Sequence, residues 1–137
     1  MVSAATKSRR SALVALAAMV LLYCLLAGGF SVARYASFKS HLHDTGLISQ
    51  SFWSTTQGLF FTNSVNPEIG RSACYFGNHF TPIYFAIAPL YWAFPSPVTL
   101  LVLQTLLIGL GALPVFFLAR RHLESQAAGL LFAFLYL

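Results

Sequence analysis

Two long runs of apolar residues, separated by a mixed segment, dominate the hydrophobic pattern of the chain. The first run covers residues 11–33 and the second covers residues 98–119, and neither contains a charged residue. Each run exceeds the roughly 20 residues that an α-helix needs to cross a membrane. The apolar centre of a secretory signal peptide, the alternative for the first run, has only about 7–15 residues. The pattern therefore predicts an all-α integral membrane protein with transmembrane helices at 11–33 and 98–119.

A third apolar run begins at Ala127 and continues to Leu137. It is shorter than the roughly 20 residues of a membrane span. We therefore expect 127–137 to be the start of a third transmembrane helix, and the chain to be the N-terminal part of a larger membrane protein. Gly109 and Gly111 predict that the second span packs closely against another helix, because small residues let helix backbones approach.

Basic residues flank both long runs and set the expected topology. Lys7, Arg9 and Arg10 precede the first run, and Arg120 and Arg121 follow the second. Because basic flanks stay on the cytoplasmic side of a membrane, both clusters are cytoplasmic only if the chain crosses the membrane twice between them.

We therefore predict a multi-pass plasma-membrane protein with a cytoplasmic N-terminus. Its disordered cytoplasmic tail covers 1–10, its extracytoplasmic loop covers 34–97 and its cytoplasmic turn covers 120–126.

Composition agrees with a membrane environment. The chain is 58% hydrophobic and 8% charged, whereas about a quarter of the residues of a soluble domain are charged. Five of the eight basic residues lie in the two flanks, so the net charge of +5 indicates contact with anionic membrane lipids and not nucleic-acid binding.

The loop between the spans contains two further helical patterns. Residues 44–58 predict an amphipathic helix that begins at a capping residue, Asp44 or Thr45, and ends at Gly58. Its apolar face, with Ile48, Phe52 and Leu59, suits the membrane interface. A second short helix, near 80–94, is apolar but too short to span about 30 Å of hydrocarbon, so we expect it to be embedded from the outer face. Turn-forming residues predict a loop over 60–78.

Asp44 is the principal candidate for chemistry in the loop. A carboxylate near low-dielectric surroundings can act as a general base or bind a metal. A helix cap, which contributes about 1 kcal/mol, is a compatible alternative. His41 and His43 precede it, and imidazole with carboxylate suits a divalent metal. Such a site would need further ligands, for which Glu68 and His79 are available, and solvated histidines are the alternative.

His79 and three outward-facing cations are candidates for phosphate binding. His79 could hold a phosphate or a sugar at the membrane surface, or it could hydrogen-bond within its own loop. Arg71, with Arg34 and Lys39, could contact a lipid phosphate, because the arginine guanidinium matches phosphate geometry.

Two motifs in the segment 35–137 are specific. They are the arrangement D-x-G-x-x-x-Q-x-x-W, with Asp44, Gly46, Gln50 and Trp53, and the turn N-H-F-x-P that begins at Asn78. With these motifs, the segment resembles the predicted membrane proteins of domain-of-unknown-function family 2079. That family is in turn similar to the glycosyltransferase C superfamily, whose members transfer a sugar from a polyprenyl-phosphate donor on the outer side of the membrane.

The resemblance implies a glycosyltransferase-C-like N-terminal part, with Asp44 as the catalytic base. It also implies His79, Arg71, Gln50 and Trp53 as substrate-binding residues, near a lipid-linked sugar donor. The chain departs from that superfamily at Thr45, where mannosyltransferases have a second acidic residue, and it has one proline where their turn has two. Metal dependence and substrate identity therefore do not carry over.

Two functional hypotheses follow. The first is a polyprenyl-phosphate-sugar-dependent glycosyltransferase. The second is a non-enzymatic transporter or a membrane assembly protein. Transporters usually place ionisable groups inside their spans, and neither long run contains one, which counts against transport.

Overall fold

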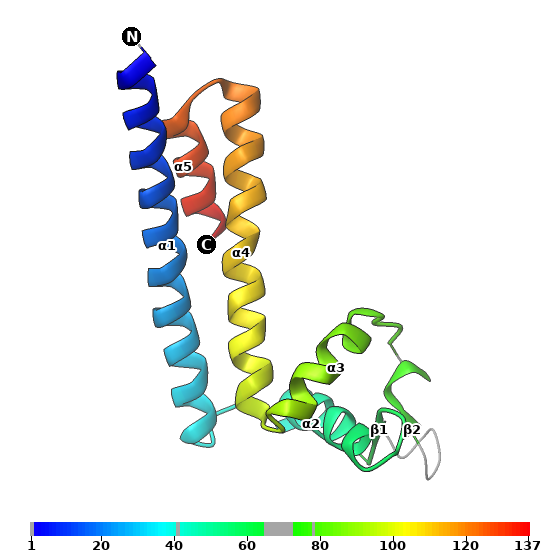
Figure 1. The fold of residues 1–137 in the computed structure, drawn as a ribbon. Coiled ribbons are helices and arrows are strands. Elements are labelled where there is room, and N and C mark those ends of the chain that lie inside the picture. The colour runs from blue at the N-terminus through cyan, green and yellow to red at the C-terminus, as the bar shows by residue number, and fades with distance from the viewer. Residues whose placement is uncertain (1, 41, 65–72, 78) are drawn as a thin grey trace. The chain divides into compact units, whose positions relative to one another are not determined.

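The computed structural model describes residues 2–40, 42–64, 73–77 and 79–137. It is predominantly helical, as the sequence predicts (Figure 1). Its α-helices and 3-10 helix are α1 (Val2–Ala36), α2 (Leu42–Thr56), η2 (Tyr75–Gly77), α3 (Ile83–Ala93), α4 (Pro97–Leu123) and α5 (Gln126–Tyr136). The two-residue strands β1 (Thr62–Asn63) and β2 (Ala73–Cys74) pair antiparallel, with Thr62 opposite Cys74. The predicted all-α class is therefore confirmed, with one short strand pair added.

Two of the described helices have the length and hydropathy of membrane spans. They cover Arg9–Ala36 and Pro97–Leu123, with mean hydropathies of 2.4 and 2.2. Both predicted spans are thus present as helices, and both are longer than the sequence indicated. α1 already begins at Val2, because the alanine and basic residues before the apolar run are good helix formers. The N-terminal tail predicted to be disordered is therefore helical from Val2.

The chain divides into two compact units. Unit 1 comprises Met1–Ser31 and Val102–Leu137, and unit 2 comprises Val32–Leu101. Unit 1 contains most of both long helices together with α5. Unit 2 contains the segment that connects them.

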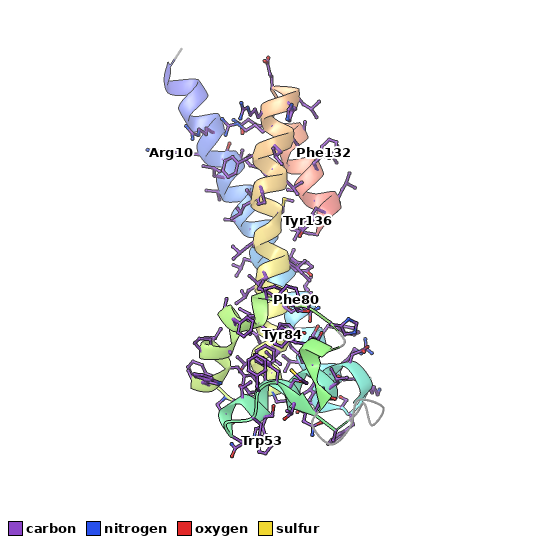
Figure 2. The ribbon with its side chains drawn as sticks, turned by 90° about the vertical axis from the view of Figure 1, so that its right-hand side faces the viewer. Arg10, Trp53, Phe80, Tyr84, Phe132 and Tyr136 are labelled. Carbon is purple, nitrogen blue, oxygen red and sulfur yellow. The ribbon has the colours of Figure 1, made fainter. Side chains whose placement is uncertain are left out.

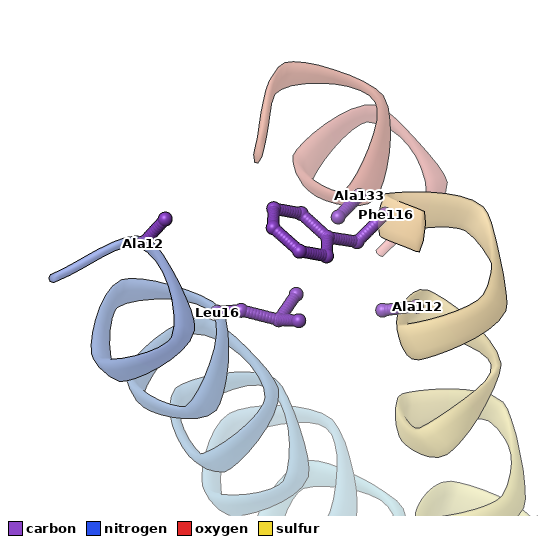
Figure 3. Packing of buried hydrophobic residues seen from close by; sticks show 5 residues of the cluster. All are labelled: Ala12, Leu16, Ala112, Phe116 and Ala133. Atoms are coloured by element: carbon purple, nitrogen blue, oxygen red, sulfur yellow. The ribbon is translucent and has the colours of Figure 1, made fainter. Parts of the chain in front are cut away.

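The three helices of unit 1 meet in a small apolar core. It consists of Ala12 and Leu16 from α1, Ala112 and Phe116 from α4, and Ala133 from α5, and the side chains point toward one another (Figure 3). The outer faces of these helices expose leucine and phenylalanine side chains. Because exposed apolar surface of this extent suits lipid or other helices better than water, the arrangement agrees with a membrane location.

Close contacts at glycines show the relative direction of α1 and α4 in unit 1. Gly28 lies beside Thr105, and Gly109 lies beside Cys24. Because a later residue of α1 meets an earlier residue of α4, the two helices are antiparallel. A Cβ atom at Gly109 would lie 2.9 Å from Cys24 Sγ, and one at Gly111 would collide with the Tyr136 ring of α5. The predicted packing role of both glycines is confirmed.

The antiparallel arrangement places the arginines of both flanks at one end of unit 1. Figure 2 shows Arg10 toward the N-terminal end of α1, and Arg120 and Arg121 lie in the last turn of the antiparallel α4. The chain leaves unit 1 and returns to it at the opposite end. This is the arrangement that the two-crossing topology requires.

Unit 2 folds around an aromatic core. Phe52 of α2, Phe61 and Tyr75 of the central segment, and Ala88 and Tyr91 of α3 are buried together. Leu47 and Ile48 of α2 pack against them, so the apolar face of α2 is covered by protein inside the unit. The amphipathic pattern thus has an internal explanation, and the position of α2 at a membrane interface stays a prediction.

Candidate functional site

Asp44 lies in the first turn of α2, and its side chain is exposed. The helix begins at Leu42, two residues earlier than predicted, so Asp44 is a first-turn residue and not the cap before the helix. The partial positive charge of a helix N-terminus stabilises a carboxylate at this position. The prediction that Asp44 caps α2 was therefore wrong. Its charge still stabilises the N-terminus of the helix.

Gly58 ends α2 as the sequence predicts. It adopts φ 77°, the left-handed conformation that glycine accepts most readily. The Leu59 amide donates to the Ser54 carbonyl over 3.0 Å and the Gly58 amide donates to that of Thr55 over 3.2 Å, which is the Schellman arrangement. The reversal of the chain after Gly58 leaves Leu59 exposed. Leu59 therefore does not share the buried face with Phe52, contrary to the helical pattern read through residue 58.

A pocket of about 260 Å³ lies within unit 2, next to Asp44 in the sequence. Its lining residues come from the end of α1 and the residues just after it, the first turns of α2 and the start of α4. They are Tyr35, Phe38, Ser40, Thr45, Gly46, Ser49 and Pro97. The walls are mostly apolar, and Ser49 Oγ is buried without a hydrogen-bond partner among the described residues. The pocket could therefore take a small ligand that has an apolar body and a polar group.

Asp44 itself is not a lining residue of this pocket. Thr45 and Gly46, which follow it directly, form part of the wall, and successive helix residues differ by about 100° around the axis. Asp44 therefore lies on the same turn of α2 as Thr45 and Gly46, but on a different face of the helix from the pocket.

Gln50 and Trp53 lie farther along α2 on a separate face. Nine residues of α-helix place Trp53 on the side opposite Asp44, and its ring is 51% exposed. Figure 2 shows Trp53 at the surface of unit 2. The structure therefore does not bring Asp44 and Trp53 to one point, although the sequence motif contains both.

Gln50 has a structural role that the sequence did not indicate. Its Nε2 donates to Ser64 Oγ over 3.0 Å, and its Oε1 accepts from the Ser64 amide over 3.0 Å. These bonds tie α2 to the residue that follows β1. The amide group is therefore already occupied by the fold, and this competes with a role in substrate binding.

Replacing Gln50 with alanine tests the two roles separately. Each hydrogen bond contributes about 0.5–1.5 kcal/mol, so we expect a Gln50→Ala chain to lose about 1–2 kcal/mol of local stability at the α2–β1 contact. Hydrogen exchange of the Ser64 amide measures this loss. Unchanged exchange at Ser64 would contradict the structural role and return Gln50 to the substrate-binding residues.

His79 packs against an aromatic pair that the sequence analysis missed. Its ring centroid lies 5.6 Å from that of Tyr75, and its amide donates to the Tyr75 carbonyl over 3.0 Å. Tyr84 stacks on Tyr75 at 4.9 Å, and its hydroxyl donates to the Tyr75 hydroxyl over 3.1 Å. The exposed His79 ring is thus held on an aromatic support. The density of aromatic residues over 75–85 was the available signal.

Tyr84 is a hydrogen-bond donor at this site and not a base. Burial raises the pKa of its phenol well above the usual range, and the hydrogen bond to Tyr75 raises it further. The group therefore stays protonated at physiological pH.

The metal hypothesis rests largely on residues outside the described part of the chain. His41 and Glu68 lie outside it, as does the side chain of His43. Arg71, the phosphate-binding candidate, also lies outside the described residues. Among the described residues, no group of three His, Cys, Asp or Glu side chains could hold a metal ion. The predicted site around His41, His43 and Asp44 therefore stays a prediction.

Comparison with known proteins gives one finding. The family model described as "Predicted membrane protein (DUF2079)" matches residues 34–137, which include nearly all of unit 2 and all of α4 and α5. No curated protein and no solved structure matches the chain. Because the match covers most of its length, the chain belongs to this family of predicted membrane proteins.

Proposed function

We propose that the chain takes part in sugar transfer from a polyprenyl-phosphate donor on the extracytoplasmic side of the plasma membrane. The observation that carries the proposal is the exposed Asp44 carboxylate in the first turn of α2, directly before the pocket-lining Thr45 and Gly46. A base needs access to a hydroxyl group, and the exposed Asp44 carboxylate, on the same helical turn as residues of the pocket wall, is open to an acceptor.

The expected topology supports this assignment. Both ends of unit 2 continue into span-length helices that are antiparallel in unit 1. With the arginine end of unit 1 in the cytoplasm, unit 2 lies on the outer side, where lipid-linked sugars are used by enzymes of the glycosyltransferase C type.

The proposed chemistry is a displacement at the anomeric carbon of the donor. Asp44 takes the proton of the acceptor hydroxyl, whose oxygen forms the new bond to that carbon. The bond from the carbon to the phosphate oxygen breaks, and polyprenyl phosphate leaves with the electron pair. His79 and Arg71 would stabilise the charge that develops on the departing phosphate.

Sugar transfer is tested with the full chain inserted into liposomes that contain a panel of labelled polyprenyl-phosphate sugars. We expect release of polyprenyl phosphate with at least one donor, because water can replace an unidentified acceptor in slow turnover. Liposomes without the protein give the background. Background release with every donor, from protein shown to be inserted, would contradict the proposal.

A non-enzymatic assembly protein is the second candidate. The observation that favours it is the exposure of α1, along which Leu21, Leu22, Leu25, Leu26 and Phe30 are all more than half exposed in the structure. Such a stripe fits lipid and equally fits a partner helix. Co-purification of a second membrane protein in place of sugar transfer would favour this candidate.

A further inference from the structure

A second pocket lies in unit 1, at the turn between α4 and α5. It has a volume of about 560 Å³ and is lined by Phe117, Arg120, Arg121, Glu124 and Gln126. None of these residues takes part in the proposed sugar chemistry. The sequence analysis assigned the arginines to topology and to general contact with anionic membrane lipids, without a specific site.

The local fold explains why these side chains surround one space. α4 ends at Leu123, Glu124 adopts φ 49°, and Ser125 begins α5 by accepting a hydrogen bond from the Ala128 amide over 3.3 Å. The chain therefore reverses within two residues. A Cβ atom at Gly129 would lie 2.9 Å from the Phe116 ring, so α5 lies tightly against α4 just beyond the turn.

The charges that line the pocket favour a ligand with a single negative charge. Two guanidinium groups and one carboxylate give a net charge of +1. Guanidinium groups bind phosphate oxygens in fork geometry. The Glu124 carboxylate would repel the second negative charge of a phosphate monoester, so a phosphodiester is the better match.

The pocket also contains hydrogen-bond acceptors in Glu124 and Gln126. Gln126 Oε1 is buried and has no hydrogen-bond partner among the described residues. A buried acceptor without a donor is unfavourable. A ligand that brings a hydroxyl or an ammonium group next to its phosphodiester would supply donors to Gln126 and Glu124.

The place of the pocket in unit 1 indicates the source of such a ligand. The pocket lies at the end of two antiparallel span-length helices where the arginines of both flanks gather. This is the level at which phospholipid headgroups contact a membrane protein, and basic pockets on the cytoplasmic side bind headgroups. Phe117 offers an apolar surface for the start of an acyl chain.

We propose that the α4–α5 pocket binds the phosphodiester of a membrane phospholipid whose headgroup carries hydrogen-bond donors. Glycerol and ethanolamine headgroups have this chemistry, and choline does not. The proposal is independent of sugar transfer and requires only that the two long helices span the membrane.

Lipid binding to the purified full chain in detergent tests the proposal by native mass spectrometry. We expect phosphatidylglycerol or phosphatidylethanolamine to bind about tenfold or more tightly than phosphatidylcholine, which is the effect of one charge-assisted hydrogen bond. The soluble diester glycerophosphoglycerol separates the two possible sources of the phosphodiester. Equal affinity for all three lipids, or binding of the soluble diester as tight as that of the lipid, would overturn the proposal.

Two charge-matched double variants distinguish the pocket from general surface charge. We expect Arg120→Gln with Arg121→Gln to weaken binding of the preferred lipid about tenfold or more. Arg9→Gln with Arg10→Gln removes the same charge from the same end of unit 1, outside the pocket lining, and should change binding less than about threefold. Equal weakening by both double variants would show a surface effect and would overturn the pocket.

A third variant tests the headgroup donors without removing charge. Gln126→Leu preserves the approximate size of the side chain but removes the acceptor. We expect it to reduce the preference over phosphatidylcholine while phosphatidylcholine binding itself is unchanged. An unchanged preference in Gln126→Leu would contradict the assigned role of the headgroup donors.

Discussion

Replacing Phe52 with alanine is expected to lower the free energy of unfolding of unit 2 by about 3–5 kcal/mol, the usual cost of removing a buried phenylalanine ring. The side chain is 1% exposed. Its ring centroid lies 4.8 Å from that of Tyr84, 5.4 Å from that of Tyr91 and 5.4 Å from that of Phe61. Phe52 therefore joins α2 to α3 and to the segment that leads into β1.

Amide hydrogen exchange of the full chain measures this effect within unit 2. A loss of about 3–5 kcal/mol lowers the protection of the α2 amides by roughly two to four orders of magnitude. Phe80→Ala is the matched control, because that ring is 83% exposed, and it should change protection by less than about fivefold. Similar losses in both variants would contradict the assignment of Phe52 to the core.

The helices could be predicted from local pattern because their causes are local. The two long spans follow from uninterrupted apolar runs, and the end of α2 follows from Gly58, whose φ of 77° suits glycine. The apolar face of α2 was also correct for Ile48 and Phe52, which pack in the core. The prediction failed for Leu59 because the helical period was extended past the residue that ends the helix.

The tertiary contacts of unit 2 could not be predicted from the same pattern. Trp92 Nε1 donates to Thr55 Oγ1 over 2.9 Å, although 37 residues separate them. Similarly, the pairing of Tyr84 with Tyr75 depends on where the central segment returns to α3. Periodicity within one helix does not identify partners in another.

The candidate site could likewise be predicted only in part from the sequence. The motif D-x-G-x-x-x-Q-x-x-W suggested one constellation, but on α2 the residues Asp44 and Trp53 lie on opposite sides, and Gln50 bonds Ser64. The pocket near Asp44 includes Pro97, which is distant in sequence. Sequence spacing thus identified Asp44 as a chemically suitable residue, whereas the residues near it in space depend on the fold.

Replacing Asp44 with asparagine is expected to lower sugar transfer by at least about 100-fold, since a positioned general base contributes roughly 10²–10⁴-fold. Asparagine preserves the size of the side chain and removes only the charge. The exposed position and the first-turn location limit the cost in stability to about 0.3–1 kcal/mol, the value of one charge at a helix terminus. Folding and insertion should therefore survive the change, which makes a loss of transfer interpretable.

The measurement compares release of polyprenyl phosphate by the wild-type chain, by Asp44→Asn and by Gln57→Ala, each inserted at equal density in donor-containing liposomes. Gln57 is the control, because it is an exposed polar residue just beyond the opposite end of α2 and should leave transfer within about threefold of wild type. Transfer by Asp44→Asn at the level of the control would remove the base from the proposed chemistry. The role of the carboxylate would then be limited to the N-terminus of α2, where its negative charge stabilises the unpaired backbone N–H groups of the first turn.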